Sequence, residues 1–380
     1  YKRQVIDHYR ETYECRSCRK NGTPYMEKAP VPYPPVLHSL ASASTITWLI
    51  HQKFELSIPL YRQEKEWEAL GLRLSRATMS NWLLVVYRDW LVHIVHRLKL
   101  ELLKQRYLHI DETHVQVLKE PGRKNTSDSY MWVYCSIRDA VNPIRYFEYQ
   151  PGRSGKYPEA FLREYEGYIH TDAYSGYNAV SGVKRCLCYT HLRRAFVDAL
   201  PKDIHNSEAS KPAEAILRLN QLFNIESELE ALPPDQKKKE RLIREKPLLE
   251  AFWSWAEKSA IGELPKSKLS KAFHYALNNR EGFWNYLEDG NCSISNSLAE
   301  NCIRPFVIGR KNWLFSGSPK GAEASAGIYT LVETAKANGL APMKYIKYIL
   351  SDMPGSAFLE HPEYLDDYLP WNPLVKEFCR

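Results

Sequence analysis

The sequence contains no uninterrupted hydrophobic run long enough to cross a membrane. Its most apolar stretch spans residues 82–98 and is broken by Arg88, Asp89, His93, His96 and Arg97. A transmembrane helix needs about 20 predominantly apolar residues. The first residues are followed by polar and charged positions instead of the apolar segment of a secretory signal. We therefore expect a cytoplasmic protein with no membrane partner.

A secreted disulfide framework is also missing. Of the eight cysteines, only Cys15/Cys18 and Cys186/Cys188 lie close together in the sequence, which favours a reducing compartment. The two-residue spacing of Cys15 and Cys18 allows a tight turn to direct both thiols at one zinc ion. A structural zinc site needs four ligands, so this pair is a partial, candidate zinc-binding element.

Positive charge is concentrated in the first third of the chain. Residues 1–110 hold 17 Lys and Arg against 10 Asp and Glu, whereas residues 111–380 hold 35 of each kind, so the whole net charge of +7 lies before residue 111. This asymmetry predicts an N-terminal region that binds a polyanion such as DNA. A solvated basic face without a partner is the alternative.

The N-terminal third divides into two expected parts. Four prolines between residues 29 and 35 indicate an extended linker, so residues 1–35 form the zinc-ribbon-like segment and linker. In residues 36–106 a helix is predicted over 61–70, then a turn at Gly71 and a second helix capped by Ser75, which is typical of a helix-turn-helix. A plain helical bundle is the alternative. The side chains best placed to reach DNA are Arg73, Arg76, Ser80 and Asn81.

Strand-like periodicity begins at residue 107. Strands are predicted over 107–118, 130–137, 144–149, 167–172 and around 185–188, with a helix over 158–165. Three antiparallel strands, then helix, strand, helix and strand, are the order of a ribonuclease H-like α/β core. We expect this catalytic domain over 107–350, with a helical insertion at about 200–265 and a C-terminal tail at 351–380.

Three acidic residues are candidates for metal chemistry. Asp111 lies at the end of the apolar stretch 107–111, and Asp172, 61 residues on, lies at the end of a second strand, and in such a sheet the two strands are neighbours. Two close carboxylates repel each other unless a cation lies between them, and their oxygens suit Mg²⁺ or Mn²⁺. Glu300 lies 128 residues further on, in a helix that Asn296 or Ser297 can cap. An exposed ion pair with Arg304 is the alternative for Glu300.

Two metal ions held by Asp111, Asp172 and Glu300 would support phosphodiester cleavage and joining without a covalent protein intermediate. A tyrosine recombinase would need Arg and His around one tyrosine, and no such spacing is present. A nuclease that cuts without joining shares the metal site. A catalytically silent DNA-binding regulator is the alternative from another class.

Four blocks of the sequence resemble transposases of the insertion sequence 66 family. They are residues 109–113, 170–177, 188–196 and 296–316. The resemblance covers nearly the whole chain and implies an Asp-Asp-Glu transposase with Asp111, Asp172 and Glu300 as its triad. It also implies a ribonuclease H-like domain interrupted by a helical insertion. Related proteins have a longer N-terminal region with a complete zinc-binding element.

The expected partners follow from this activity. They are double-stranded DNA, as element ends and as target, a homo-oligomer on that DNA, and accessory proteins of the same element, which implies a nucleoid-associated location. Further basic residues predicted to hold phosphates are Arg193, Arg194, Arg304, Arg310, Lys311 and Lys320. Trp313 and Phe315 lie among them and can stack on a base. For Cys188 and His191, a metal pair is the alternative to a packed core.

Overall fold

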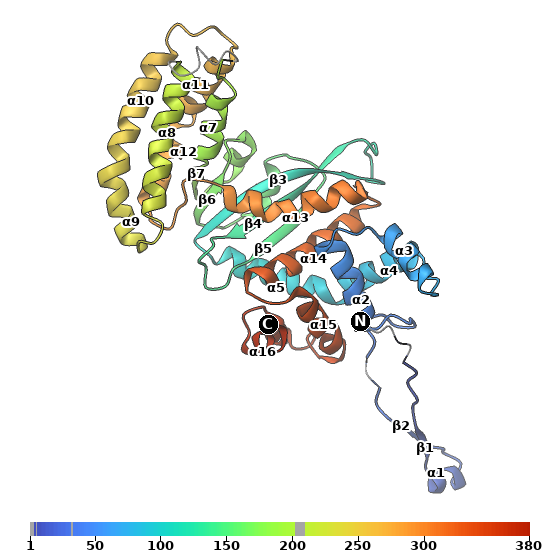
Figure 1. Cartoon of the computed structure of the whole chain (residues 1–380). Helices are drawn as coiled ribbons and strands as arrows, with labels where there is room; N and C mark the ends of the chain where they lie inside the picture. Colours follow the sequence, from blue (N-terminus) through green and yellow to red (C-terminus); the bar gives the residue numbers. More distant parts are fainter. Residues whose placement is uncertain (1–3, 5, 32, 202–209) are drawn as a thin grey trace.

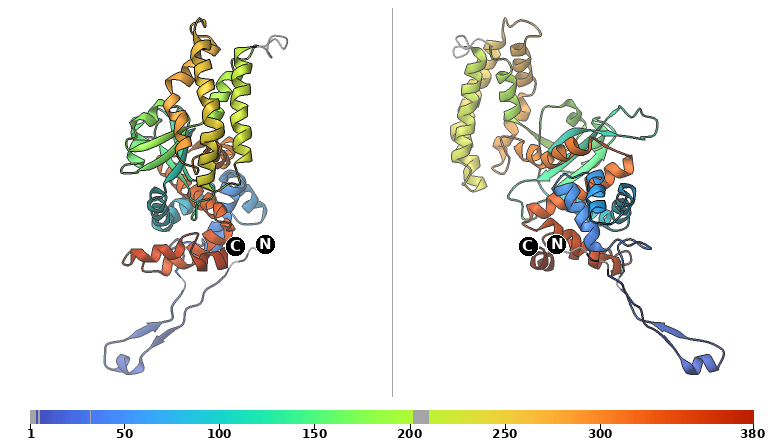
Figure 2. Two further views of the ribbon diagram at one scale, coloured as in Figure 1. Left: turned by 90° about the vertical axis from the view of Figure 1, so that its left-hand side faces the viewer. Right: turned by 45° about the vertical axis from the view of Figure 1, so that its right-hand side comes forward.

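The computed structural model describes residues 4, 6–31, 33–201 and 210–380. Its centre is a mixed six-stranded sheet with helices around it, a helical bundle at one end and a thin arm at the other (Figure 1). The two further views in Figure 2 show the bundle and the arm projecting from opposite ends of the central body. Within the described residues, no helix has the length and apolar character needed to span a bilayer.

The arm, residues 6–31, is a small hairpin. Strands β1 (Thr12–Glu14) and β2 (Met26–Lys28) pair antiparallel, and helix α1 (Arg16–Lys20) lies between them. All its strand residues are exposed, because the hairpin has no core of its own. The proline-containing segment that follows leads back to the body.

Helices form the next part of the chain. They are α2 (Ala43–Ile50), π-helix η1 (His51–Glu55), α3 (Leu60–Ala69), α4 (Arg76–Val86), π-helix η2 (Tyr87–Leu91) and α5 (Val92–Leu103). Between α3 and α4, Gly71 adopts φ +86°, a left-handed conformation that glycine reaches without strain. The Ser75 side chain accepts the Thr78 amide at 3.1 Å, which confirms the predicted cap of α4.

The main sheet has the strand order β5-β4-β3-β6-β7. Its strands are β3 (Tyr107–Val117), β4 (Asp128–Ser136), β5 (Arg145–Gln150), β6 (Gly167–Thr171) and β7 (Val183–Leu187), with β8 (Phe315–Ser316) beside the end of β3. The first three are antiparallel, whereas β6 and β7 run parallel to β3. Helix α6 (Lys156–Phe161) and 3₁₀-helix η3 (Ser175–Ala179) lie in the connections. The predicted positions of all five strands are confirmed.

Two C-terminal helices contact the sheet. Helix α13 (Ser297–Trp313) packs on β3 and β4, and α14 (Pro319–Ala337) packs along β5. The Thr330 hydroxyl accepts the Phe147 amide at 2.8 Å, and the Thr334 hydroxyl accepts the Arg145 amide at 3.1 Å. Because β5 is the outer strand, its amides lack a neighbouring strand on one side. The two threonine hydroxyls accept hydrogen bonds from amides that would otherwise form an open sheet edge.

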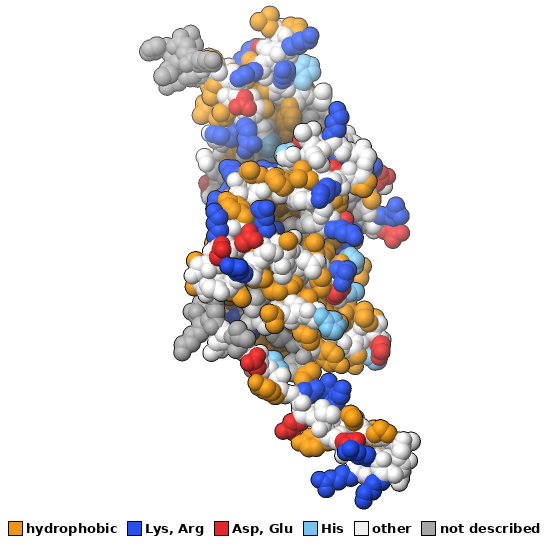
Figure 3. All heavy atoms as spheres, turned by 90° about the vertical axis from the view of Figure 1, so that its right-hand side faces the viewer, with side chains coloured by type: hydrophobic (Ala, Val, Ile, Leu, Met, Phe, Trp, Pro, Cys, Tyr) orange, Lys and Arg blue, Asp and Glu red, His pale blue; other side chains and the backbone are white. Residues whose placement is uncertain are grey.

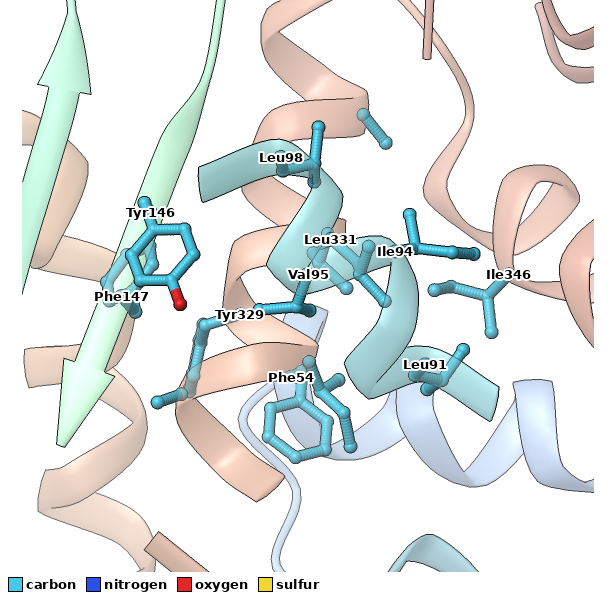
Figure 4. Packing of buried hydrophobic residues seen from close by; sticks show 14 of the residues in the cluster. Phe54, Leu91, Ile94, Val95, Leu98, Tyr146, Phe147, Tyr329, Leu331 and Ile346 are labelled. Carbon is cyan, nitrogen blue, oxygen red and sulfur yellow. The ribbon is translucent and has the colours of Figure 1, made fainter. Parts of the chain in front are cut away.

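The main hydrophobic core lies between α5, α14 and β5. Figure 4 shows its closely packed side chains, which include Val95, Leu98, Phe147, Tyr329 and Leu331. Residues 351–380, expected as a tail, are folded onto the same body. They form 3₁₀-helices η7 (Met353–Gly355) and η8 (Pro362–Tyr368) and helix α16 (Pro373–Cys379), which packs on α15 (Pro342–Asp352). This segment folds because Tyr368, Leu369 and Val375 are buried.

A second hydrophobic cluster joins the helical bundle to β6 and β7. Its elements are α7 (Tyr189–Val197), α8 (Lys211–Glu228), α9 (Pro234–Glu240), π-helix η5 (Arg241–Glu245), α10 (Lys246–Ala260), α11 (Lys268–Asn278), α12 (Arg280–Trp284) and 3₁₀-helix η6 (Asn285–Glu288). The helices continue past residue 265 because Phe273, Ala276 and Phe283 supply part of the bundle core. The expected start of the insertion, near residue 200, borders residues 202–209, which lie outside the described residues.

Arg241 is fully buried inside the bundle. Its guanidinium bonds both carboxylate oxygens of Glu226, at 2.5 and 2.9 Å. It also donates to the carbonyl oxygens of Tyr286, Asp289 and Cys292. Tyr286 lies in η6 at the end of the bundle, whereas Asp289 and Cys292 lie in the segment that leads to α13, so one side chain connects the bundle with that return segment.

Candidate active site

Asp111 and Asp172 lie at neighbouring positions of the sheet. Strands β3 and β6 pair in parallel with His109 opposite His170, and continuing this register puts Asp111 opposite Asp172. Neighbouring strands are about 4.8 Å apart, so two carboxylates at this position are close. Asp172 follows the last residue of β6, and its carboxylate accepts the Tyr174 amide at 2.9 Å. Arg185 fixes the same loop by donating to the carbonyls of Asp172 and Tyr174.

Asn296 attaches the start of α13 to β3. Its amide group donates to the Ile110 carbonyl at 2.7 Å, and its carbonyl oxygen lies 2.9 Å from His109 Nδ1. Of the two expected caps, Asn296 is the N-cap residue of α13, but its buried side chain bonds the strand instead of the first helical turn. This attachment brings Glu300, one turn further along α13, to the side of the sheet that carries Asp111.

The electrostatics of Asp111 reflect these neighbours. Burial raises the pKa of Asp111 to about 7, and the negative charges of Glu112, Asp172 and Glu300 add to the rise. A carboxylate that is desolvated and next to other carboxylates is favoured in its ionised form by a bound cation. Three oxygen ligands of this kind fit Mg²⁺ or Mn²⁺ by their chemistry. Within the described residues, however, Asp111, Asp172 and Glu300 do not form a group with all ligand atoms inside 4.8 Å.

Arg153 and Glu112 belong to this environment and were not predicted from the sequence. Arg153 lies 2.6 Å from a Glu112 oxygen and 3.9 Å from an Asp172 oxygen, and its guanidinium stacks over Tyr174. The other Glu112 oxygen accepts the Tyr177 hydroxyl. Both carboxylate oxygens of Glu112 are therefore paired, one with Arg153 and one with Tyr177. Its position next to Asp111 in the sequence was the signal that could have identified it.

Glu300 faces Cys188 and His191. One ligand atom from each of these three side chains lies within 4.8 Å of the other two. Glu300 Oε1 is 3.8 Å from His191 Nδ1, and this contact with His191 differs from the alternative of an exposed pair with Arg304. Burial raises the pKa of the Cys188 thiol, but His191 and the Asn296 amide lower it more, so the pKa lies below its ordinary value.

A cavity of about 390 Å³ opens beside Asp172. Its wall includes Arg153, Tyr174, His191, Arg194 and Tyr275, so it lies between the sheet and the bundle. Arg194 is exposed here, and its binding of phosphate stays a prediction. Arg193, predicted for the same role, instead donates to Asn220 of α8 at 2.8 Å and supports the bundle.

The other basic residues predicted to bind DNA occupy different kinds of environment. Those with exposed side chains are Arg73, Arg76, Ser80, Asn81, Arg304, Lys311 and Lys320. Arg310 donates to the Thr113 hydroxyl and to the His114 carbonyl, which holds α13 to β3. Trp313 packs beside Phe306 and Tyr329, whereas Phe315 is exposed. Figure 3 shows Lys and Arg side chains at the end of the N-terminal arm and over the body, with acidic ones among them.

Cys15 and Cys18 lie together at the tip of the arm. Cys15 precedes α1 and Cys18 lies within it, and both are free thiols. Across the described ranges, no other His, Cys, Asp or Glu side chain joins this pair in a metal-ligand group. The zinc site at Cys15 and Cys18 therefore stays a prediction.

Comparison with known proteins supplies the family. The model of the family described as "Transposase IS66 family" matches residues 38–324. Three proteins of Sinorhizobium fredii are similar along most of this chain. "Uncharacterized protein y4hP" is 26% identical over 97% of this chain and 68% of its own length, and "Uncharacterized protein y4jD" is 26% identical over 96% and 71%. "Uncharacterized protein y4qI" is 28% identical over 88% and 63%. The family match covers the sheet, the bundle and the start of α14, so this chain belongs to the IS66 transposase family.

Proposed function

We propose that this protein cuts and joins the DNA ends of an insertion sequence, with Asp111, Asp172 and Glu300 as its catalytic acidic residues. The observation that carries this proposal is the parallel pairing of β3 and β6, whose register puts His109 opposite His170, two residues before Asp111 and Asp172. The strand order β5-β4-β3-β6-β7 supports a ribonuclease H-like core, and the family match supports transposition as the process.

The three carboxylates would hold two Mg²⁺ or Mn²⁺ ions. When bound, these ions would activate a water molecule or a 3′ hydroxyl and stabilise the leaving oxygen. For its part, the chain has to bring Glu300 toward Asp111 and Asp172, since Glu300 now faces His191. Arg153 is placed to bind a phosphate near Asp172, and Arg194 borders the same cavity.

The helices α3 and α4 are proposed as the helix-turn-helix that binds double-stranded DNA. The exposed Arg73, Arg76, Ser80 and Asn81 lie on the turn and on the first half of α4, where a recognition helix contacts base edges. Action on paired element ends implies a homo-oligomer on DNA, and accessory proteins of the element are proposed partners. A nucleoid-associated location follows from this function.

The test is a strand-transfer assay with pre-cleaved element-end DNA and Mg²⁺ or Mn²⁺. Asp111→Ala, Asp172→Ala and Glu300→Ala should each abolish joined product, because each removes a metal ligand. Glu250→Ala on the exposed face of α10 is the matched control and should keep the parent activity. Nicking without joining would replace the proposal with a nuclease, and DNA binding without any reaction would replace it with a silent DNA-binding regulator.

A further inference from the structure

Three chemically different side chains meet next to the proposed catalytic residues. Cys188 comes just after β7, His191 lies in the first turn of α7, and Glu300 lies in the first turn of α13. Their ligand atoms all lie within 4.8 Å of one another. A thiolate, an imidazole and a carboxylate together match the ligands that zinc prefers, whereas carboxylates alone suit Mg²⁺.

Two of these ligand atoms lack a hydrogen-bond partner. His191 Nδ1 and Glu300 Oε1 are both buried, and within the described residues neither has a partner at hydrogen-bonding geometry, although the His191 ring interacts with the Cys188 thiol. They are 3.8 Å apart, slightly more than the separation of about 3.4 Å that a tetrahedral zinc ion needs between nitrogen and oxygen ligands. Buried polar atoms without partners are costly, and an ion between them would satisfy both.

The surroundings of Cys188 favour a metal-binding thiolate. The backbone amide of Asn296 donates to its sulfur at 3.1 Å. Cys188 also stands at the N-terminus of α7, where the helix dipole stabilises negative charge. The sulfur therefore already has the amide donor that commonly supports a metal-bound thiolate.

We infer that Cys188, His191 and Glu300 bind one Zn²⁺ ion, and that this zinc holds Glu300 away from Asp111 and Asp172. The inhibitory part rests on the proposed function of Glu300, but zinc binding does not. Glu300 is shared by the two sites, so an ion bound with sulfur and nitrogen ligands competes with the oxygen-bound Mg²⁺ or Mn²⁺ for that carboxylate. Zinc is then an inhibitor, and it must leave this site before Glu300 can bind the catalytic metal ions.

A second His and Cys group provides a control. His170, Cys186 and Cys292 also lie within 4.8 Å of one another. Both ring nitrogens of His170 are already used, since Nδ1 contacts the Leu108 carbonyl at 3.1 Å and Nε2 accepts the Ser293 amide at 2.9 Å. This group is therefore a hydrogen-bonded part of the core, and Cys292→Ser should leave zinc binding unchanged.

Zinc binding is tested in the full chain with Cys15→Ser and Cys18→Ser, which removes the arm thiols. Competition with a chromophoric chelator should give one bound Zn²⁺, and Co²⁺ in its place should show thiolate charge-transfer absorption. Cys188→Ser should remove that absorption, and His191→Gln, at a half-buried position, should weaken binding at least about tenfold. If Cys188→Ser and His191→Gln both keep zinc binding with unchanged melting curves, the inference is overturned. It is also overturned if Cys292→Ser is the one variant that loses zinc binding.

Inhibition is tested separately in the strand-transfer assay. Micromolar Zn²⁺ added at a fixed Mn²⁺ concentration should stop the parent, and the half-inhibiting concentration should rise at least about tenfold in His191→Gln, relative to its own zinc-free rate. Equal inhibition of both proteins overturns the inhibitory role. If no protein joins DNA, the proposed function fails, while the chelator measurement still decides whether the zinc site exists.

Discussion

Asp111 is a residue whose charge the folded protein disfavours. It lies beside Glu112, Asp172 and Glu300, and its pKa rises to about 7 from an ordinary value of 3.8. In the unfolded chain the same group ionises near its ordinary value, so the unfolded state loses this proton first as pH rises. The metal-free fold therefore loses stability from about pH 4 to about pH 7, and the loss is complete above pH 7.

Asp111→Asn should stabilise the metal-free protein at pH 8, because an amide cannot ionise. A shift of about three pKa units corresponds to at most about 4 kcal/mol, and partial exposure reduces it. The measurement is thermal unfolding in the presence of a chelator. At pH 4 the two proteins should melt alike, and equal melting at pH 8 as well would show that the Asp111 carboxyl is not disfavoured by the fold.

At the residue scale, the sequence was informative where a local pattern carried the signal. Asp111 and Asp172 could be found because each ends an apolar stretch, although Asp111 lies within β3 and not at its end, and Glu300 could be found because it lies in the first turn of a helix. The part that Arg153 plays could not be predicted, because its contact with Asp172 forms only when separate strands of the sheet come together. Asn296 was a predicted cap and is the N-cap residue of α13, but its side-chain partners could not be predicted because His109 and Ile110 lie more than 180 residues away.

Among the elements, α14 has a contact with the sheet that its own sequence does not reveal. The hydroxyls of Thr330 and Thr334 accept hydrogen bonds from backbone amides of β5, and the contact of Thr330 with Phe147 spans 183 residues. Strand and helix positions were predictable from periodicity and caps. Which helix covers the outer strand was not, because a threonine within a helix usually bonds its own preceding turn, as the Thr330 hydroxyl also does by donating to the Ala326 carbonyl at 3.0 Å.

Thr330→Val should destabilise the protein, because it leaves the buried Phe147 amide without an acceptor while keeping the side-chain shape. The expected loss is about 1–3 kcal/mol. Chemical denaturation measures this loss, and hydrogen exchange should show faster exchange at Phe147. Thr12→Val on the exposed strand β1 is the control, with an expected change within about 0.5 kcal/mol. Unchanged exchange at Phe147 would contradict the proposed role of the hydroxyl.

For the whole molecule, the charge distribution agrees with where the exposed basic side chains lie. The arm and the stretch from α2 to α5 carry part of the positive excess before residue 111, since residues 6–31 and 43–103 together hold 13 Lys and Arg against 10 Asp and Glu. The composition of the sequence was enough to locate this excess of charge. It was not enough to predict where the bundle ends, which was expected at about residue 265. The bundle runs to Glu288 because α11 and α12 complete its core, a tertiary reason that composition does not contain.

Arg73→Ala with Arg76→Ala should weaken binding to DNA and lower its salt dependence. If each arginine contacts one phosphate, the slope of log affinity against log salt should decrease in magnitude by about 2. The measurement is fluorescence anisotropy over a range of salt concentrations. Lys238→Ala with Lys239→Ala in α9 removes the same charge from the bundle and is the control. An equal effect of both double variants would mean that net charge alone, and not α4, governs binding.

The buried Arg241 connects the bundle with the segment that follows it. The chain leaves the sheet after β7, passes through the bundle and returns to α13. The carbonyls of Tyr286 at the end of the bundle and of Asp289 and Cys292 just after it all bond this one guanidinium. A few residues later the same segment reaches Asn296 and α13. Because Glu300 lies in the first turn of that helix, one buried guanidinium connects the bundle with the chain segment that leads to a proposed catalytic residue.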